Sequence, residues 1–237
     1  MNNGLVGIII LLVIVVIYIY ARSQVHADVD VNGRTWQVIA SYENSNEAAQ
    51  ILSRCHERML RFMRALKTKY HIDEPLEIAS SHYDPDVHEG NPIPRFHGSA
   101  APSDDVQTIV ETLLDNFNPD VFYENDPRYS NDTSYTMNKG DAMYIGLRKK
   151  DDPTQFEHED TIFFVLLHES AHIANYNGWG HDDRFWTVFK FLIHEAVEAG
   201  VYIPTDYAKY PEPYMSISIY YQPLFDNSLP NIWEHRT

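Results

Sequence analysis

The sequence has little cysteine and little positive charge, and both shortages exclude whole classes of protein. A single cysteine, Cys55, cannot form a disulfide within the chain, so the chain is neither a disulfide-bonded scaffold nor a zinc module built from several cysteines. Only 18 Lys and Arg residues stand against 34 Asp and Glu residues, which gives a formal net charge of −16. Because binding to nucleic acid needs a basic surface, we expect no binding to DNA or RNA.

The chain has enough apolar material for one well-packed domain. Of its 237 residues, 44% are hydrophobic and 13% are aromatic, which excludes wholesale disorder. A single core usually takes about 100 to 200 residues, so the length suits one domain with small appendages. Twelve histidines are the main supply of metal ligands and acid–base groups.

The first 22 residues predict a membrane anchor. No charged side chain occurs between Asn2 and Ala21, and a helix over Gly4–Ala21 would rise roughly 27 Å, close to the ~30 Å hydrocarbon core. A cleaved signal peptide is the alternative, but no basic segment precedes the apolar run and the run is long. Arg22 and Arg34 follow the span, which favours a single-pass protein with its C-terminal domain on the cytosolic side.

Hydrophobic spacing along the rest of the chain predicts an α+β domain. We expect a hairpin over residues 28–39, because Asn32-Gly33 favours a tight turn between two alternating runs. The other expected elements are helices over residues 46–69, 104–117 and 183–199, two strands within residues 135–148, and loops over residues 80–102 and 118–133.

Two groups of side chains within these elements have an ordinary and a functional interpretation. A basic stripe on the first helix could bind an acidic partner, although a solvated helix face is the commoner role. Three histidines in the first loop could hold a second metal, although scattered loop histidines are usually surface residues. The stripe consists of Arg54, Arg58, Arg61, Arg64 and Lys67, and the loop histidines are His82, His88 and His97.

The strongest functional signal is the HExxH pattern over His168–His172, which lies in an apolar helical stretch. Residues four apart share a helix face, so both imidazoles can reach one zinc ion. Glu169 is placed to take a proton from a zinc-bound water and pass it to a leaving amine. Gly178 and Gly180 then let the chain double back, so that His181 can supply a third ligand and leave the fourth position open.

Other roles for the same segment stay open. The motif histidines could be hydrogen-bonded core side chains, although burying them with a glutamate would be costly without a cation, and a zinc ion there could be purely structural. Asp182 and Asp183 could cap the next helix, which is the commoner role, or bond to a ligating imidazole. His194-Glu195 begins a second His-Glu pair, but residue 198 is glutamate, so we expect helix surface there.

His168 to His172, the following Gly180-His181 and the Phe185-Trp186 pair together resemble the WLM/SprT-like zinc metallopeptidases. The longer run over residues 134–220 is similar to membrane-anchored WLM-like proteins of large DNA viruses. The resemblance implies a zincin-like fold, zinc held by His168, His172 and His181, and Glu169 as the catalytic base. Such relatives often act on DNA-bound proteins, which the charge of −16 argues against here.

Two departures argue against the metzincin branch of zinc peptidases. The third histidine follows His172 by nine residues rather than six, and Asn175 stands where metzincins have glycine.

Two further expectations concern the substrate cleft. A strand over Ala142–Arg148 comes before the zinc-binding helix, and an edge strand beside the metal can pair with an extended peptide, so Met143–Leu147 should border the cleft. Tyr207, Tyr210 or Tyr214 could stabilise an oxyanion, although structural packing is the commoner role for such tyrosines.

The sequence therefore predicts a membrane-anchored zinc metallopeptidase that hydrolyses peptide bonds. Its expected parts are an anchor over residues 1–22, a hairpin and linker over 23–45, a zincin-like domain over 46–201 with a small, mostly antiparallel sheet packed on helices, and a Tyr/Pro-rich tail over 202–237 that packs on the domain. The expected cofactor is one zinc ion. The expected partners are a membrane, a peptide or protein substrate and viral structural proteins, with a virion or virus-internal membrane as a candidate location. A non-catalytic structural or virion protein that keeps the zinc site is the alternative.

Overall fold

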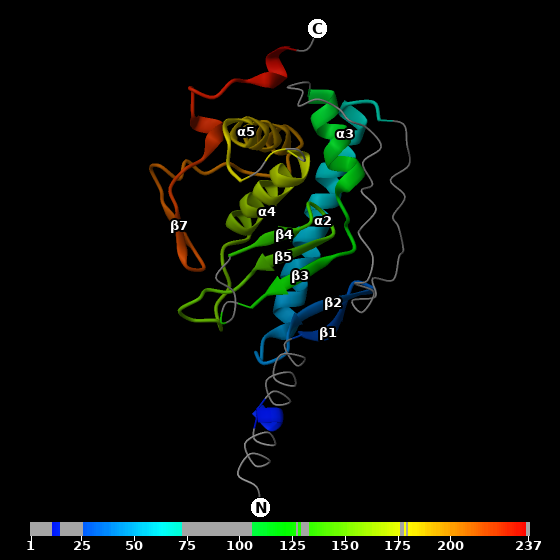
Figure 1. The fold of residues 1–237 in the computed structure, drawn as a ribbon, viewed down its shortest axis with the longest axis vertical. Helices are drawn as coiled ribbons and strands as arrows, with labels where there is room; N and C mark the ends of the chain where they lie inside the picture. Colours follow the sequence, from blue (N-terminus) through cyan, green and yellow to red (C-terminus); the bar gives the residue numbers. More distant parts are fainter. Residues whose placement is uncertain are drawn as a thin grey trace, which may run out of the picture.

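The computed structural model describes residues 11–14, 26–72, 106–126, 128, 133–175, 178 and 180–235. Within them, a five-stranded sheet in the order β1-β2-β3-β5-β4 packs against a layer of helices (Figure 1). Helix α2 covers β1 to β3, helix α4 covers β4 and β5, and α2 and α4 contact each other. The helices are α2 (Ser45–Lys69), α3 (Val106–Asn116), α4 (Glu159–Ala174) and α5 (Asp183–Glu198). The sheet strands are β1 (His26–Val31), β2 (Arg34–Ile39), β3 (Phe122–Asn125), β4 (Tyr135–Met137) and β5 (Ala142–Gly146).

The expected hairpin at the start of the domain is confirmed. Strands β1 and β2 pair antiparallel, with Val31 opposite Arg34. The two residues between them, Asn32 and Gly33, have φ angles of 55° and 77°, the left-handed conformations that a tight two-residue hairpin turn requires. The α+β class is confirmed as well, because strands and helices form separate layers.

The sheet is mixed rather than mostly antiparallel, so that part of the expectation was wrong. Strand β3 pairs parallel with β2 on one side and parallel with β5 on the other, while β1–β2 and β4–β5 are antiparallel. Strand β3 lies in the segment 118–133 that was expected to be a loop. Its four residues are all buried, and two of them, Glu124 and Asn125, are polar, which conceals the strand in the sequence.

Strand β5 is a central strand, which contradicts the expectation that Ala142–Arg148 forms the sheet edge. It lies between β3 and β4, so both of its sides are paired. The edge strand is instead the short strand β4, the first of the two strands predicted within residues 135–148.

The C-terminal tail packs on the domain as expected, but it is more regular than its sequence indicated. A second, two-stranded sheet is formed by β6 (Glu212–Tyr214) and β7 (Ile217–Ile219), followed by short 3₁₀ turns at Pro223–Phe225 and Ile232–His235. Figure 1 shows this hairpin beside α4 and α5, on the far side of α4 from the main sheet's β1–β2 end. The division of the chain into four parts stays a prediction.

Two expectations fall on residues that the structure does not describe. The predicted anchor lies outside the described residues except for a helical stretch at 11–14, whose four apolar side chains are exposed. Among the helices that are described, none combines the length and the apolarity needed to cross a bilayer. The loop histidines His82, His88 and His97 also lie outside the described residues.

A buried ion pair joins the strands at the centre of the sheet. Glu124 on β3 and Arg148, just after β5, are both fully buried, with 2.5 Å between Glu124 Oε1 and Arg148 Nε. Glu124 Oε2 also accepts a hydrogen bond of 2.6 Å from the backbone N–H of Ile39, and Arg148 donates to the Asn44 side chain at the start of α2. Burial raises the pKa of Glu124, which the charge of Arg148 opposes. The pair therefore fixes β2, β3, β5 and α2 relative to one another.

Replacing Arg148 by methionine tests this arrangement. Because Arg148→Met leaves the Glu124 carboxylate buried without its partner, we expect the free energy of unfolding to fall by about 3 to 5 kcal/mol, measured by urea denaturation. Arg54→Met is the matched control, since Arg54 pairs with Glu159 at the surface and should cost less than about 1 kcal/mol. Equal losses in the two variants would contradict the proposed role of the buried pair.

Candidate metal centre

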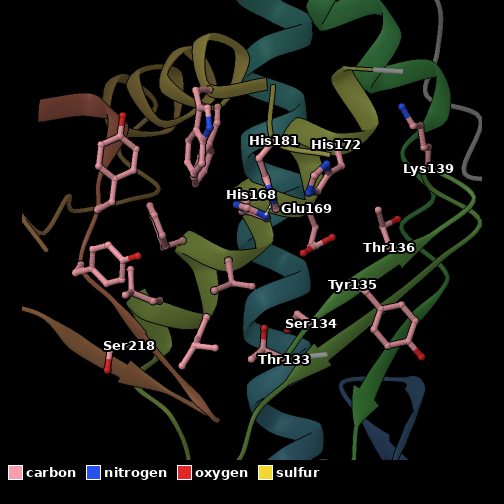
Figure 2. A pocket seen from close by; sticks show the side chains of 18 residues that line it. Thr133, Ser134, Tyr135, Thr136, Lys139, His168, Glu169, His172, His181 and Ser218 are labelled. Carbon is pink, nitrogen blue, oxygen red and sulfur yellow. Dashed lines mark hydrogen bonds between the residues drawn. The ribbon is translucent and has the colours of Figure 1, made fainter. Parts of the chain in front are cut away.

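The structure brings the three predicted histidine ligands together. His168 and His172 lie one turn apart on α4, and His181 comes from the residues just before α5 (Figure 2). One nitrogen from each ring lies within 4.8 Å of the others, and the Nε2 atoms of His168 and His181 are 3.0 Å apart. Among the described residues, this is the group of His, Cys, Asp and Glu side chains that could hold a metal ion.

The donor set fits a transition-metal ion and is compatible with zinc. Two imidazole nitrogens about 2.0 Å from a tetrahedral zinc would lie roughly 3.3 Å apart, close to the separation of the His168 and His181 nitrogens. Within the described part of the chain the group has three members, and three imidazole nitrogens leave one coordination position of a tetrahedral ion for a water or a substrate. The arrangement therefore resembles an open site rather than a closed structural one.

The surroundings keep the three imidazoles neutral. Burial, with smaller contributions from the neighbouring histidines, lowers the pKa of His168 to about 3. Burial and the proximity of His181 lower the pKa of His172 to about 4, and burial lowers the pKa of His181. At neutral pH all three rings can therefore offer a nitrogen lone pair without first losing a proton.

Aromatic side chains from α5 support the histidine cluster. The ring centroid of fully buried Phe185 lies 4.9 Å from His168, 4.4 Å from His172 and 4.7 Å from His181. Trp186 lies 5.7 Å from His181. The Phe185-Trp186 pair noted in the sequence is thus part of the packing that holds the ligand rings in place.

The segment that carries His181 is tied to the end of α4. Asp182 caps α5 by accepting a 2.7 Å hydrogen bond from the backbone N–H of Phe185, so the capping role is confirmed. The same carboxylate oxygen lies 3.3 Å from the amide nitrogen of Asn175, which follows α4. Arg184 donates to the Asn175 side-chain oxygen. Asn175, at the position where metzincins have glycine, therefore joins the two helices on either side of the ligand segment.

Lys139 fixes the same segment from the sheet side. Lys139 lies in the turn between β4 and β5. Its Nζ donates to the backbone oxygens of Asn175 at 2.9 Å and of Gly178 at 2.7 Å. Gly178 packs so closely that a Cβ there would lie 2.1 Å from the Asn175 amide nitrogen. The segment leading to His181 is therefore held from both sides.

Glu169 lies beside the histidines with only 6% of its surface exposed. In Figure 2 its carboxylate lies next to His172, on the side of the cluster that faces Thr136 of β4. The predicted base thus occupies the space between the helix that carries the ligands and the edge strand of the sheet.

A cleft of about 930 Å³ opens over the cluster. Its floor is one face of α4, formed by Val165, His168, Glu169 and His172 at the spacing expected for a helix. One wall is formed by residues 133–136 at the start of β4, and the other by residues 217–221 of the tail with Trp186 and Phe189 of α5.

Two expectations about residues near the cleft need correction, and one is confirmed in part. The strand that borders the cleft is β4 rather than Met143–Leu147, because β5 is central. Tyr207 and Tyr214 are buried in the core, so the packing role is confirmed for these two, and the described tyrosines that line the cleft are Tyr135, Tyr220 and Tyr221. Glu195, expected at the helix surface, is 2% exposed and pairs over 2.6 Å with Lys69, the last residue of α2.

Comparison with known proteins finds one family model that matches part of the chain. Residues 103–209 match the family described as WLM domain. This segment, just under half of the chain, is similar to the WLM domain. The matched segment includes α3 to α5 and all three histidines, and the resemblance predicted from the sequence is confirmed. WLM domains are metallopeptidase-like, so the chain is related to peptidases at that coarse level.

A viral relative supports the same assignment. An uncharacterized protein of Acanthamoeba polyphaga mimivirus is 30% identical over 118 residues, which cover 47% of this chain and 57% of that protein. The similarity thus spans just over half of the relative's length. No solved structure matches the chain.

The hydrogen bonds of Lys139 predict an effect on metal affinity. Lys139→Met keeps a side chain of similar length but removes the two hydrogen bonds to the segment that leads to His181. We therefore expect zinc to bind about ten- to a hundredfold more weakly, as measured by competition with a chelator. Lys150→Met, at an exposed position, is the control and should bind zinc as the parent does. Unchanged zinc affinity in Lys139→Met would show that the segment is held without this side chain.

Proposed function

We propose that this chain is a zinc metallopeptidase that hydrolyses peptide bonds in an extended polypeptide. The observation that carries the proposal is the placement of three imidazoles and one glutamate in the lining of one cleft. The WLM domain supports it, because this family is metallopeptidase-like.

His168, His172 and His181 would hold the zinc ion. When bound in such a site, zinc lowers the pKa of a coordinated water to near 7 and polarises a carbonyl oxygen. The three histidines contribute the nitrogens, and Phe185 behind them keeps the rings oriented and excludes water from that side.

Glu169 would act as the general base and then as the general acid. It follows His168 directly, so the helix presents its carboxylate beside the ligands, at the edge of the cleft that faces β4. In this position it can accept a proton from the attacking water and deliver that proton to the amine that leaves when the C–N bond breaks. Its low exposure keeps bulk solvent from competing for the proton.

Strand β4 would bind the substrate backbone. It is the edge strand of the sheet and pairs only with β5 among the described strands, so its other side can form main-chain hydrogen bonds with an extended peptide. This wall runs beside Glu169 and His172, so a paired peptide would place a carbonyl group near the metal site.

We propose for the whole protein a single-pass membrane location, resting on the uncharged apolar run over residues 1–22. The domain would face the cytosol or, by the viral similarity, the interior of a virion or virus-internal membrane, where viral structural proteins are candidate partners. The charge of −16 argues against nucleic acid as a partner.

A pair of variants separates metal binding from turnover. Glu169→Gln removes the base but no ligand, so it should keep stoichiometric zinc, measured by atomic emission, while cleavage of a denatured protein slows by about 10²- to 10⁴-fold. His181→Ala removes a ligand and should retain less zinc than the parent. His194→Ala, on α5 outside the cluster, is the control and should retain zinc.

Two outcomes would contradict the assignment. If Glu169→Gln cleaves as fast as the parent, or if the parent binds zinc but cleaves nothing, the zinc is structural. If His181→Ala holds zinc as tightly as the parent, a different residue is the third ligand.

A further inference from the structure

The C-terminal tail forms one wall of the cleft, and this wall lies outside the WLM match. Residues 217–221, which comprise β7 and the two tyrosines after it, line the cleft opposite β4. The family match ends at residue 209, so this wall is an addition to the matched domain. Figure 2 shows Ser218 of β7 across α4 from Thr133 and Ser134.

The wall is fixed to the sheet at one end. The hydroxyl of fully buried Tyr214, in β6, donates to the backbone oxygen of Gly146 at 2.8 Å and lies 2.7 Å from the hydroxyl of Ser134. The backbone N–H of Met215, in the turn before β7, donates to Glu157 Oε1 at 2.6 Å. The turn before β7 is therefore held close to Ser134, the residue before β4.

The wall is fixed to α5 at the other end. The Tyr221 hydroxyl donates to Asp226 Oδ2 at 2.7 Å, and the Tyr221 ring packs against Trp186 with 5.1 Å between centroids. Lys190 of α5, only 3% exposed, donates to the backbone oxygens of Asp226 at 2.8 Å and of Leu229 at 2.9 Å. Anchored at both ends, β7 is a preformed surface rather than a loose tail.

The surface that this wall presents is apolar and exposed. Ile217 is 50% exposed and Tyr220 is 71% exposed, although both line the cleft. Buried Phe164 and Phe189 continue the apolar lining deeper, beside His168. Large apolar side chains gathered on one wall of a cleft indicate a partner that covers them.

The backbone of β7 adds a second reason to expect an extended partner. The two-stranded sheet has the order β6-β7, and β7 rather than β6 lines the cleft. Two strands, β4 and β7, thus border the same cleft from opposite sides. An extended polypeptide segment can lie between the two strands and reach α4, whereas a folded domain cannot enter the space between them.

We infer that β7 and Tyr220 select the substrate: an extended segment lies between β4 and β7 and places a large apolar side chain against Ile217 and Tyr220. That the bound segment is then cleaved rests on the proposed peptidase function. That the segment binds between β4 and β7 does not depend on it. The favoured substrates are therefore unstructured polypeptide segments with leucine-like or aromatic side chains. Segments with only polar or charged side chains should bind more weakly.

Binding in the absence of turnover tests this inference. The full-length chain carrying Glu169→Gln is titrated into two fluorescent, unstructured ten-residue peptides that differ only in a central Leu or Ser, and anisotropy gives Kd. The Leu peptide should bind about tenfold more tightly than the Ser peptide, since burial of one leucine side chain contributes at least that factor. Adding Ile217→Ser and Tyr220→Ser should remove this preference by weakening the Leu peptide alone.

Matched surface changes provide the control. Ile203 and Tyr210 are 74% and 69% exposed but do not line the cleft, so Ile203→Ser with Tyr210→Ser should leave both Kd values unchanged. The inference is overturned if the parent does not prefer the Leu peptide, if neither peptide binds, or if the cleft and control pairs have the same effect. Because no cleavage is measured, failure of the peptidase proposal alone would leave the Leu preference intact.

Discussion

The burial of α4 is the constraint on which the rest of the site depends. All six residues from Ile162 to Leu167 are buried, and the helix contacts α2, α3, α5, β4 and β5. Rotating or sliding this helix would expose apolar side chains that each contribute about 1.5 to 3 kcal/mol when buried. The face that carries His168, Glu169 and His172 is consequently fixed toward the one side where the packing leaves a cleft.

The third ligand depends on a different kind of contact. His181 belongs to an irregular segment between two helices, and polar bonds position the backbone of this segment, while Phe185 and Trp186 pack against the His181 ring. Asn175 links the segment to Asp182 and Arg184, and Lys139 joins it to the turn between β4 and β5. The ligand set is thus assembled from a packed helix and a hydrogen-bonded segment.

Sequence reasoning succeeded where one local pattern determines the structure. Asn32-Gly33 predicts its turn, and the spacing of His168, His172 and His181 predicts their convergence. It failed where tertiary contacts decide. Strand β3 contains Glu124 and Asn125, which are buried only because Arg148 and Ile39 lie beside Glu124 and the Thr133 backbone oxygen accepts a bond from Asn125. The hairpin of β6 and β7 turns through Met215 at a φ of 51°, a conformation for which methionine gives no signal.

The central claim is that three histidines hold a zinc ion whose fourth position is open. X-ray absorption at the zinc edge of the full-length, zinc-loaded chain measures this directly. The account predicts three imidazole nitrogens and one oxygen at about 2.0 to 2.1 Å, with the multiple scattering typical of histidine rings. A spectrum without three histidines, or one with four protein ligands and no water, would contradict it.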